Sequence, residues 1–202
     1  MYQPAAFAET HPQRLHDLIR AHPLGLLVTS GAEAGPVVDA LPFALDTPAQ
    51  GPARLLAHVA RANPLWHTHP VGQPVLVVFQ GPQAYVSPGW YPSKAEHGKA
   101  VPTWNYTLVQ ARGTLRVIDG DPVWMRVFLA ALTHTHESTQ PQPWRMDDAP
   151  PAYIDAMLQA VVGLEIEVID LQGKFKLSQN QPQPNQAGVY HALVHSHHPG
   201  DQ

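Results

Sequence analysis

The stretch "GLEIEVIDLQGKFKLSQN", residues 163–180, decides the fold class because it carries the clearest two-residue period in the chain. In its first half, Leu164 and Ile166 alternate with Glu165 and Glu167, the pattern of a strand with one buried and one exposed face. We expect the carboxylates to face water and the aliphatic side chains to face a core.

The second half of the same stretch is polar. Lys174 and Lys176 lie on one side of the predicted strand, and Ser178, Gln179 and Asn180 follow at its end. Two interpretations are open: the lysines mark a solvated edge strand, or the amines and hydrogen-bonding groups line a binding site.

Six further segments have the composition of strands. Gly81-Pro82 predicts a turn between two of them, and Gly113 predicts a bend within the longest. About seven strands with helices inserted, and no regular alternation of strand and helix, predict a mainly β (α+β), largely antiparallel barrel. The segments are "LGLLVTS", "PVVDALPFAL", "ARLLAHVA", "PVLVVFQ", "QAYVSP" and "TWNYTLVQARGTLRVI". We expect one domain over residues 1–202, with 181–202 as a Pro- and His-rich tail.

Composition excludes several classes of function. The chain has 202 residues and no cysteine, which excludes disulfides, thiolate metal sites and a catalytic cysteine. The formal net charge of -4 argues against nucleic-acid binding through an extended basic surface. No apolar run approaches the roughly 20 residues that cross a bilayer, and the first residues lack the pattern of a leader peptide. We therefore expect a cytoplasmic protein without a membrane segment.

The segment "HVARANPLW", beginning at His58, is a candidate phosphate site. Arg61 and Asn63 stand where a strand ends and a short helix is predicted to begin, so a guanidinium and backbone N–H groups could meet one phosphate. The alternative is that Asn63 only caps the helix and Arg61 is a surface charge.

The segment "SPGWYPSKAEHGKAVPTWNY", residues 87–106, concentrates aromatic rings and polar groups. A planar ligand needs flat apolar faces and a few donors at its edge, although a packed loop would use the same residues. The faces would come from Trp90, Tyr91, Trp104 and Tyr106, and the polar contacts from Ser87, Lys94, Thr103 and Asn105.

Taken in order, "MYQPAAF", "HVARANPLW", "YVSPGWYPSK", "VPTWNY" and "GKFKLSQN" resemble the PaiB-type family, described as FMN-binding negative transcriptional regulators. The resemblance runs from Met1 to about Asn180. It implies a split β-barrel of the flavin-reductase and pyridoxine-phosphate-oxidase type, with peripheral helices. It also implies a homodimer with FMN at the subunit interface.

The resemblance further implies which residues contact FMN. The phosphate end would lie at His58, Arg61, Ala62 and Asn63. The ribityl chain or ring would lie among Ser87, Lys94, Thr103, Trp104 and Asn105. A later strand, of the same or the partner subunit, would add Lys176, Ser178, Gln179 and Asn180.

Two classes of function remain open, a regulator and an FMN-dependent oxidoreductase or flavin reductase. No catalytic acid or base is identifiable from the sequence. The clearest predicted helix, "DPVWMRVFLAALTHTHE", carries one arginine, which disfavours a DNA recognition helix. A third interpretation is haem binding, because related split barrels bind haem, but most of the thirteen histidines fall in turns or in the tail.

We expect no metal site. His134 and His136 are two residues apart, so on a helix they point to different sides and cannot share one ion. The tail histidines, His191, His195, His197 and His198, lack a fixed set of partners. The tail also lacks the charged helix that the family resemblance leads us to expect there.

Overall fold

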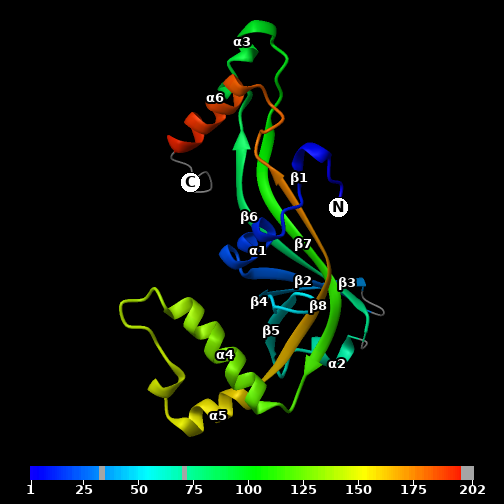
Figure 1. Cartoon of the computed structure of the whole chain (residues 1–202), viewed down its shortest axis with the longest axis vertical. Helices are drawn as coiled ribbons and strands as arrows, with labels where there is room; N and C mark the ends of the chain where they lie inside the picture. Colours follow the sequence, from blue (N-terminus) through cyan, green and yellow to red (C-terminus); the bar gives the residue numbers. More distant parts are fainter. Residues whose placement is uncertain (32–34, 70–71, 197–202) are drawn as a thin grey trace. The chain divides into compact units, whose positions relative to one another are not determined.

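The computed structural model describes residues 1–31, 35–69 and 72–196, so His197 and His198 lie outside the described residues. Strands and helices alternate irregularly along the chain (Figure 1). The strands are β1 (Ala8–Glu9), β2 (Leu24–Gly31), β3 (Gly35–Pro42), β4 (Ala44–Asp46), β5 (Arg54–Ala60), β6 (Pro74–Val86), β7 (Thr103–Ile118) and β8 (Val161–Lys176). The helices are α1 (Pro12–Ala21), α2 (Leu65–Thr68), α3 (Ser93–His97), α4 (Pro122–Glu137), α5 (Pro151–Gln159) and α6 (Gln183–Val194), with short 3-10 turns η1 (Ala5–Phe7), η2 (Pro88–Trp90) and η3 (Met146–Asp148).

The strands form an eight-stranded sheet in the order β3-β2-β6-β7-β8-β5-β4, with β1 paired to β8. The pairs β1–β8, β2–β3, β4–β5 and β5–β8 are antiparallel. The mainly β, antiparallel architecture expected from the sequence is therefore confirmed. The edge-strand interpretation of the two lysines is wrong, because β8 lies between β7 and β5 and also pairs with β1.

The predicted turn at Gly81-Pro82 does not form, because β6 continues through it to Val86. A Cβ atom at Gly81 would lie 2.3 Å from the Thr107 Oγ1. The glycine therefore makes room for the Thr107 side chain on β7 and does not reverse the chain. Gly113 has the same function within continuous β7, since a Cβ there would lie 2.2 Å from the carbonyl oxygen of Glu167 on β8.

The alternation in β8 is confirmed for its aliphatic positions, since Leu164 and Ile166 are fully buried. The expectation that Glu165 faces water is wrong, because it is only 9% exposed. Arg116 and Arg54 cover its carboxylate, at N–O distances of 2.9 and 3.6 Å. Ion pairing from the neighbouring strands thus replaces the water that the two-residue pattern predicts.

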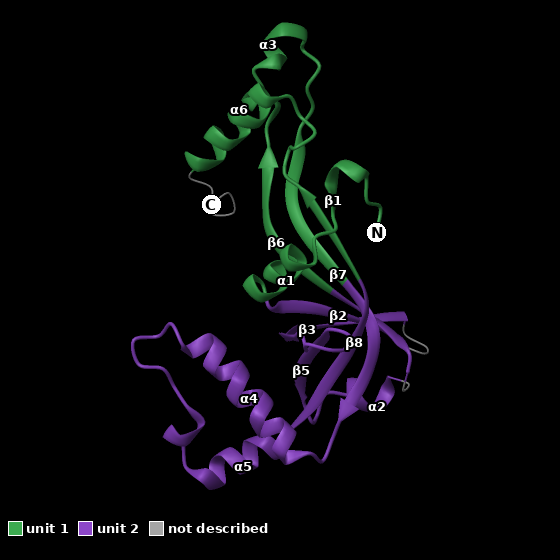
Figure 2. Cartoon of the chain, in the orientation of Figure 1, with its two compact units in different colours: residues 1–22, 78–110, 171–202 green, residues 23–77, 111–170 purple. Residues whose placement is uncertain are grey.

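The described chain divides into two compact units (Figure 2). Unit 1 comprises residues 1–22, 78–110 and 171–202, and unit 2 comprises 23–77 and 111–170. Strands β6, β7 and β8 each contribute residues to both units, whereas every other strand belongs to one unit. The expectation of a single domain over residues 1–202 stays a prediction.

Each unit packs helices of its own. In unit 1, α1 buries Leu15, Leu18 and Ile19. The expected Pro- and His-rich tail contributes α6, which packs near η2 through Val189.

In unit 2, α4 and α5 pack on a cluster of Met125, Phe128, Ile154 and Leu158. Not all apolar residues of α4 are buried. Val123 and Val127 are 73% and 65% exposed. In the part of the chain that the structure describes, no helix combines the length and apolarity needed to cross a membrane.

Candidate functional site

In unit 1, the end of β8 meets the start of β7. Lys176 is the last residue of β8, and its Nζ donates to the Thr103 Oγ1 and to the Trp104 carbonyl oxygen. Burial lowers the pKa of Lys176 below its ordinary value, Lys174 lowers it further, and Tyr106 opposes the shift. The sequence-predicted Lys176 and Thr103 are therefore in direct contact.

Asn105 and Ser178 form a buried polar pair beside Lys176. The Asn105 Nδ2 lies 3.0 Å from the Ser178 Oγ, and the Asn105 Oδ1 lies 3.1 Å from the same hydroxyl. Both residues are less than 7% exposed. Ser178 has a φ of 63°, in the left-handed region that non-glycine residues rarely adopt, so the surrounding bonds hold a strained backbone.

Helix α6 supplies a third buried polar residue, Asn185, which is 3% exposed. Its Nδ2 donates to the Ser93 Oγ at 2.9 Å and to the Gln181 Oε1 at 3.2 Å, and its Oδ1 accepts from the Ser93 backbone N–H. Because Ser93 begins α3, these bonds fix α6 against α3.

These groups line one pocket of about 310 Å³ in unit 1. Five of the residues that the family resemblance assigns to FMN contribute to its lining: Thr103, Asn105, Lys176, Ser178 and Asn180. The lining also includes Tyr91, Ser93, His97, Lys99, Gln181 and Asn185. The sequence analysis did not identify Asn185. The one feature near it that marks local structure is a proline in the first turn of α6, which indicates a helix start but not a pocket residue.

The other residues of unit 1 that the family resemblance assigns to FMN do not line this pocket. The Ser87 Oγ accepts from the Gly89 N–H at 3.1 Å and caps η2. Lys94 lies on the exposed surface of α3. Trp104 is 54% exposed and packs edge-on against Tyr85, while the Gln179 side chain bonds to the backbone of Leu177 and Phe175.

In unit 2, the Arg61 guanidinium is already bonded to protein groups. Its Nη2 lies 2.8 Å from the Asp119 Oδ1 and donates to the Val161 carbonyl oxygen, and its Nε donates to the Gln159 carbonyl oxygen at 2.7 Å. The guanidinium also lies over the Trp66 ring, 5.5 Å from its centroid. This pairing lowers the pKa of Asp119 below its ordinary value.

Asn63 and Ala62 lie in the turn that follows β5. The Asn63 Oδ1 accepts from the Leu65 N–H at 2.8 Å, and its Nδ2 donates to the Asp39 Oδ1 at 2.9 Å. The Asn63 side chain therefore bonds to the first residue of α2, but the N-cap residue of that helix is Pro64 and not Asn63 as the sequence predicts. Ala62 is exposed.

His58, on β5, is half-buried and packs edge-on against Phe128, with ring centroids 6.0 Å apart. Its Nδ1 is buried and has no hydrogen-bond partner within the described chain. Burial lowers the pKa of His58 below its ordinary value of 6.5, because desolvation disfavours the charged ring.

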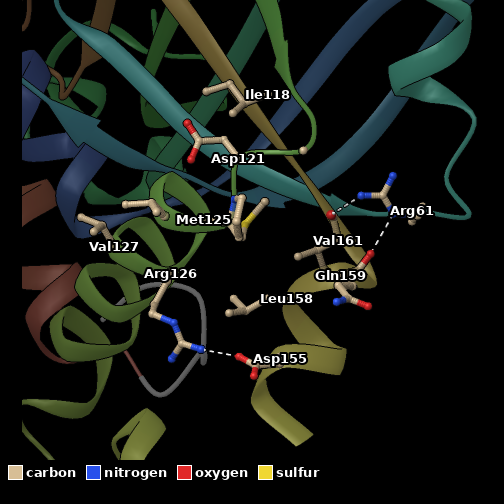
Figure 3. A pocket seen from close by; sticks show the side chains of 13 residues that line it. Arg61, Ile118, Asp121, Met125, Arg126, Val127, Asp155, Leu158, Gln159 and Val161 are labelled. Carbon is tan, nitrogen blue, oxygen red and sulfur yellow. Dashed lines mark hydrogen bonds and ion pairs between the residues drawn. The ribbon is translucent and has the colours of Figure 1, made fainter. Parts of the chain in front are cut away.

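Arg61 also lines a second pocket, of about 520 Å³, between the start of α4 and the end of α5 (Figure 3). Figure 3 shows Arg61 directed at the carbonyl oxygens of Gln159 and Val161, and Arg126 directed at Asp155. Both arginines facing this pocket thus have carboxylate partners, Asp119 for Arg61 and Asp155 for Arg126.

His134 and His136 both lie in the last turn of α4. In the described ranges 1–31, 35–69 and 72–196, no group of three or more His, Cys, Asp or Glu side chains is placed to hold a metal ion.

The sheet and the peripheral helices define a split β-barrel, and comparison with a solved structure supports this fold. The chain shares the fold of the flavocytochrome Anf3 from Azotobacter vinelandii with a TM-score of 0.61, covering 84% of this chain and 69% of that one at 15% identity. At this identity the likeness establishes the fold alone.

Comparison with known sequences identifies the family. Residues 1–170 match the family model described as "Putative FMN-binding domain". The chain is 32% identical to the protein AN0679 of Emericella nidulans over 94% of this chain and 88% of that one. It is 29% identical to the protease synthase and sporulation protein PAI 2 of Bacillus subtilis, over 98% of this chain and 92% of that one.

The chain therefore belongs to this FMN-binding family, and the PaiB resemblance seen in its motifs is confirmed. Membership of the family assigns FMN as the cofactor.

Proposed function

We propose that this chain is a homodimeric, FMN-binding regulator of the PaiB type, with FMN at the subunit interface. The observation that carries the proposal is the meeting of five predicted residues in one pocket. They come from two stretches 73 residues apart, joined by the Asn105–Ser178 pair. In this proposal Lys176 and Thr103 donate hydrogen bonds to FMN, and the buried Asn105–Ser178 pair holds the end of β8 in position.

The part of the proposal that concerns a homodimer is supported by the edge strand β3. Among the described residues β3 stands at one end of the sheet order, beside β2, and its Val37 and Val38 are 44% and 56% exposed. Leu24 and Leu26 on the adjacent β2 are also exposed, at 65% and 42%. An exposed apolar edge of this kind favours burial against a second copy of the chain, because unprotected edges otherwise promote aggregation.

The regulatory part of the proposal does not rest on a recognition helix. On α4, Arg126 is paired with Asp155 at 2.6 Å, and the aliphatic side chains of Val123 and Val127 are exposed. An apolar helix face suits contact with protein rather than with phosphates. We therefore attribute repression to a partner protein or to a surface that the dimer assembles.

The FMN site is tested by titrating the purified protein with FMN and following flavin fluorescence. Lys176→Ala is expected to weaken binding by roughly tenfold, because it removes a charged donor. Arg112→Ala is the control, because Arg112 is an exposed cation paired with Asp170 outside the pocket, and it should leave affinity unchanged. Absence of FMN binding, or equal affinity of Lys176→Ala and wild type, would contradict the proposal.

Arg61→Ala tests the predicted phosphate end in unit 2 separately. Because Arg61 already has a carboxylate partner, we expect a smaller loss of FMN affinity than for Lys176→Ala. If Arg61→Ala has no effect on FMN affinity, the phosphate assignment at His58 to Asn63 is wrong.

The alternative function, an FMN-dependent oxidoreductase, stays a prediction. It is separated from the regulator by mixing the FMN-loaded protein with NADH or NADPH without oxygen. The FMN supplies the redox chemistry in that case, and bleaching of the flavin absorbance would favour the enzyme. An unchanged spectrum would favour the regulator.

A further inference from the structure

The pocket of unit 1 has an unusual balance of charge. Lys176, Lys99 and His97 all contribute to its lining, and none of its lining residues in the described chain is an aspartate or a glutamate. Most arginines of the described chain, in contrast, have an acidic partner. The arginines Arg14, Arg54, Arg61, Arg112, Arg116 and Arg126 each pair with a carboxylate.

Lys176 is the central group of this pocket. An ammonium group has three N–H donors, and Lys176 uses two of them on the Thr103 hydroxyl and the Trp104 carbonyl oxygen. Within the described residues its Nζ has no carboxylate partner. Burial and the nearby Lys174 hold the pKa of Lys176 below its ordinary value, which is the behaviour of a cation that lacks a counterion.

The polar groups around Lys176 are fixed in place. The Asn105–Ser178 pair is buried at the end of β8, and Asn185, which also lines the pocket, ties α6 to Ser93. The positive φ of Ser178 shows that the turn after β8 is held at a cost in backbone energy, and such strain concentrates at ligand sites. The pocket is thus a hydrogen-bonded set of polar groups around a cation that has no carboxylate partner in the described chain.

The geometry points to an oxyanion site: we propose that this pocket binds the phosphate or carboxylate group of a small ligand, with Lys176 and Lys99 as its charged donors. A volume of about 310 Å³ suits a small molecule or one end of a larger one. The inference deepens the proposed function and rests on it only for the identity of the ligand, since the charge balance itself does not depend on FMN.

The test is calorimetric titration of the full-length protein, free of FMN, with inorganic phosphate at low ionic strength. We expect saturable binding that weakens as chloride is added, because exposed charges are screened by salt. Lys176→Gln and Lys99→Gln should each weaken phosphate binding by roughly tenfold. Arg112→Gln, which changes an exposed cation outside the lining, should bind like wild type.

The absence of saturable phosphate binding, or equal weakening by all three variants, overturns the proposal. Circular dichroism and thermal melting report whether each variant folds. Lys99 is exposed and makes no side-chain bond within the described residues, so Lys99→Gln keeps the test decisive if Lys176→Gln does not fold.

A second arm identifies the source of the oxyanion. If FMN displaces bound phosphate and riboflavin, which lacks the phosphate, does not, the occupant is the phosphate of FMN itself. If phosphate still binds to FMN-saturated protein, the pocket serves a separate small anion. Because FMN binding is read by flavin fluorescence and phosphate binding by heat, failure of one is distinguishable from failure of the other.

Discussion

Arg61 in unit 2 and Lys176 in unit 1 were both predicted to contact FMN, and their surroundings differ in one respect. Arg61 forms an ion pair with Asp119, and the two side chains are 42% and 41% exposed. Lys176 donates only to a hydroxyl and a carbonyl oxygen, beside a pair of buried polar side chains. The arginine is neutralised by the protein, whereas the lysine is not.

This difference shows that residue type alone does not identify an anion site. A guanidinium with a carboxylate partner and two carbonyl acceptors must release part of that network before it binds phosphate. A lysine without a counterion gains its first charged partner when an anion binds. The unit 1 pocket therefore needs less rearrangement to bind an anion, and the following variants test how strongly each region depends on its internal bonds.

The largest expected effect is on the buried pair. Asn105→Ala leaves the Ser178 hydroxyl buried without its partner, so we expect the free energy of unfolding to fall by about 1–3 kcal/mol. Asp119→Ala in the Arg61 region should cost much less, because an exposed ion pair contributes little. Urea denaturation at pH 7 measures both, and an equal loss in the two variants would remove the contrast between the regions.

A second, smaller effect concerns the backbone at Ser178. Ser178→Ala and Ser178→Gly both remove the hydroxyl, but only glycine relieves the positive φ of 63°. We expect the glycine variant to be more stable than the alanine variant by about 1 kcal/mol, again from urea denaturation. If alanine is equally stable, the left-handed conformation at this position carries no strain.

The smallest effect is the pH dependence that His58 gives to unit 2. Because its pKa in the folded protein lies below 6.5, the unfolded chain binds a proton more readily, and stability falls as the pH drops below 6.5. His58→Gln should lower the slope of unfolding free energy against pH between about 7 and 5.

The control for this slope is His16→Gln, because burial and Arg20 also lower the pKa of His16 and Asp17 opposes them. If His58→Gln keeps the wild-type slope while His16→Gln reduces it, the buried ring of His58 is not the group that responds to pH.

Much of the fold could be predicted because it depends on local patterns. The alternation of Leu164 and Ile166 predicts buried strand positions whichever strands pair with them. The two glycines, in contrast, were interpreted as a turn and a bend. Gly81 and Gly113 lie within continuous strands, because their missing side chains make room for Thr107 and for the Glu167 backbone. Close approach between strands cannot be distinguished from a turn by reading one strand alone.

The candidate site shows the same limit. Its polar residues were found because amides, hydroxyls and amines gather in two short motifs, which also carry the family resemblance. Asn185 was not found, since its partner Ser93 lies 92 residues away and nothing near Asn185 in sequence marks the contact. The ring and ribityl contacts predicted for Ser87 and Lys94 remain predictions, although both residues lie outside the pocket.

The sequence by itself determined the alternating strands, the FMN-binding family and the residues that could bind a charged ligand, because each is encoded in short runs of neighbouring residues. Only the tertiary structure decided which of the two cations has a counterion. Asp119 lies 58 residues from Arg61 and reaches it through the fold, while no carboxylate lines the pocket around Lys176 in the described chain. Electrostatic interactions depend on distance in space, so the charge available to a ligand follows from the packing of distant segments.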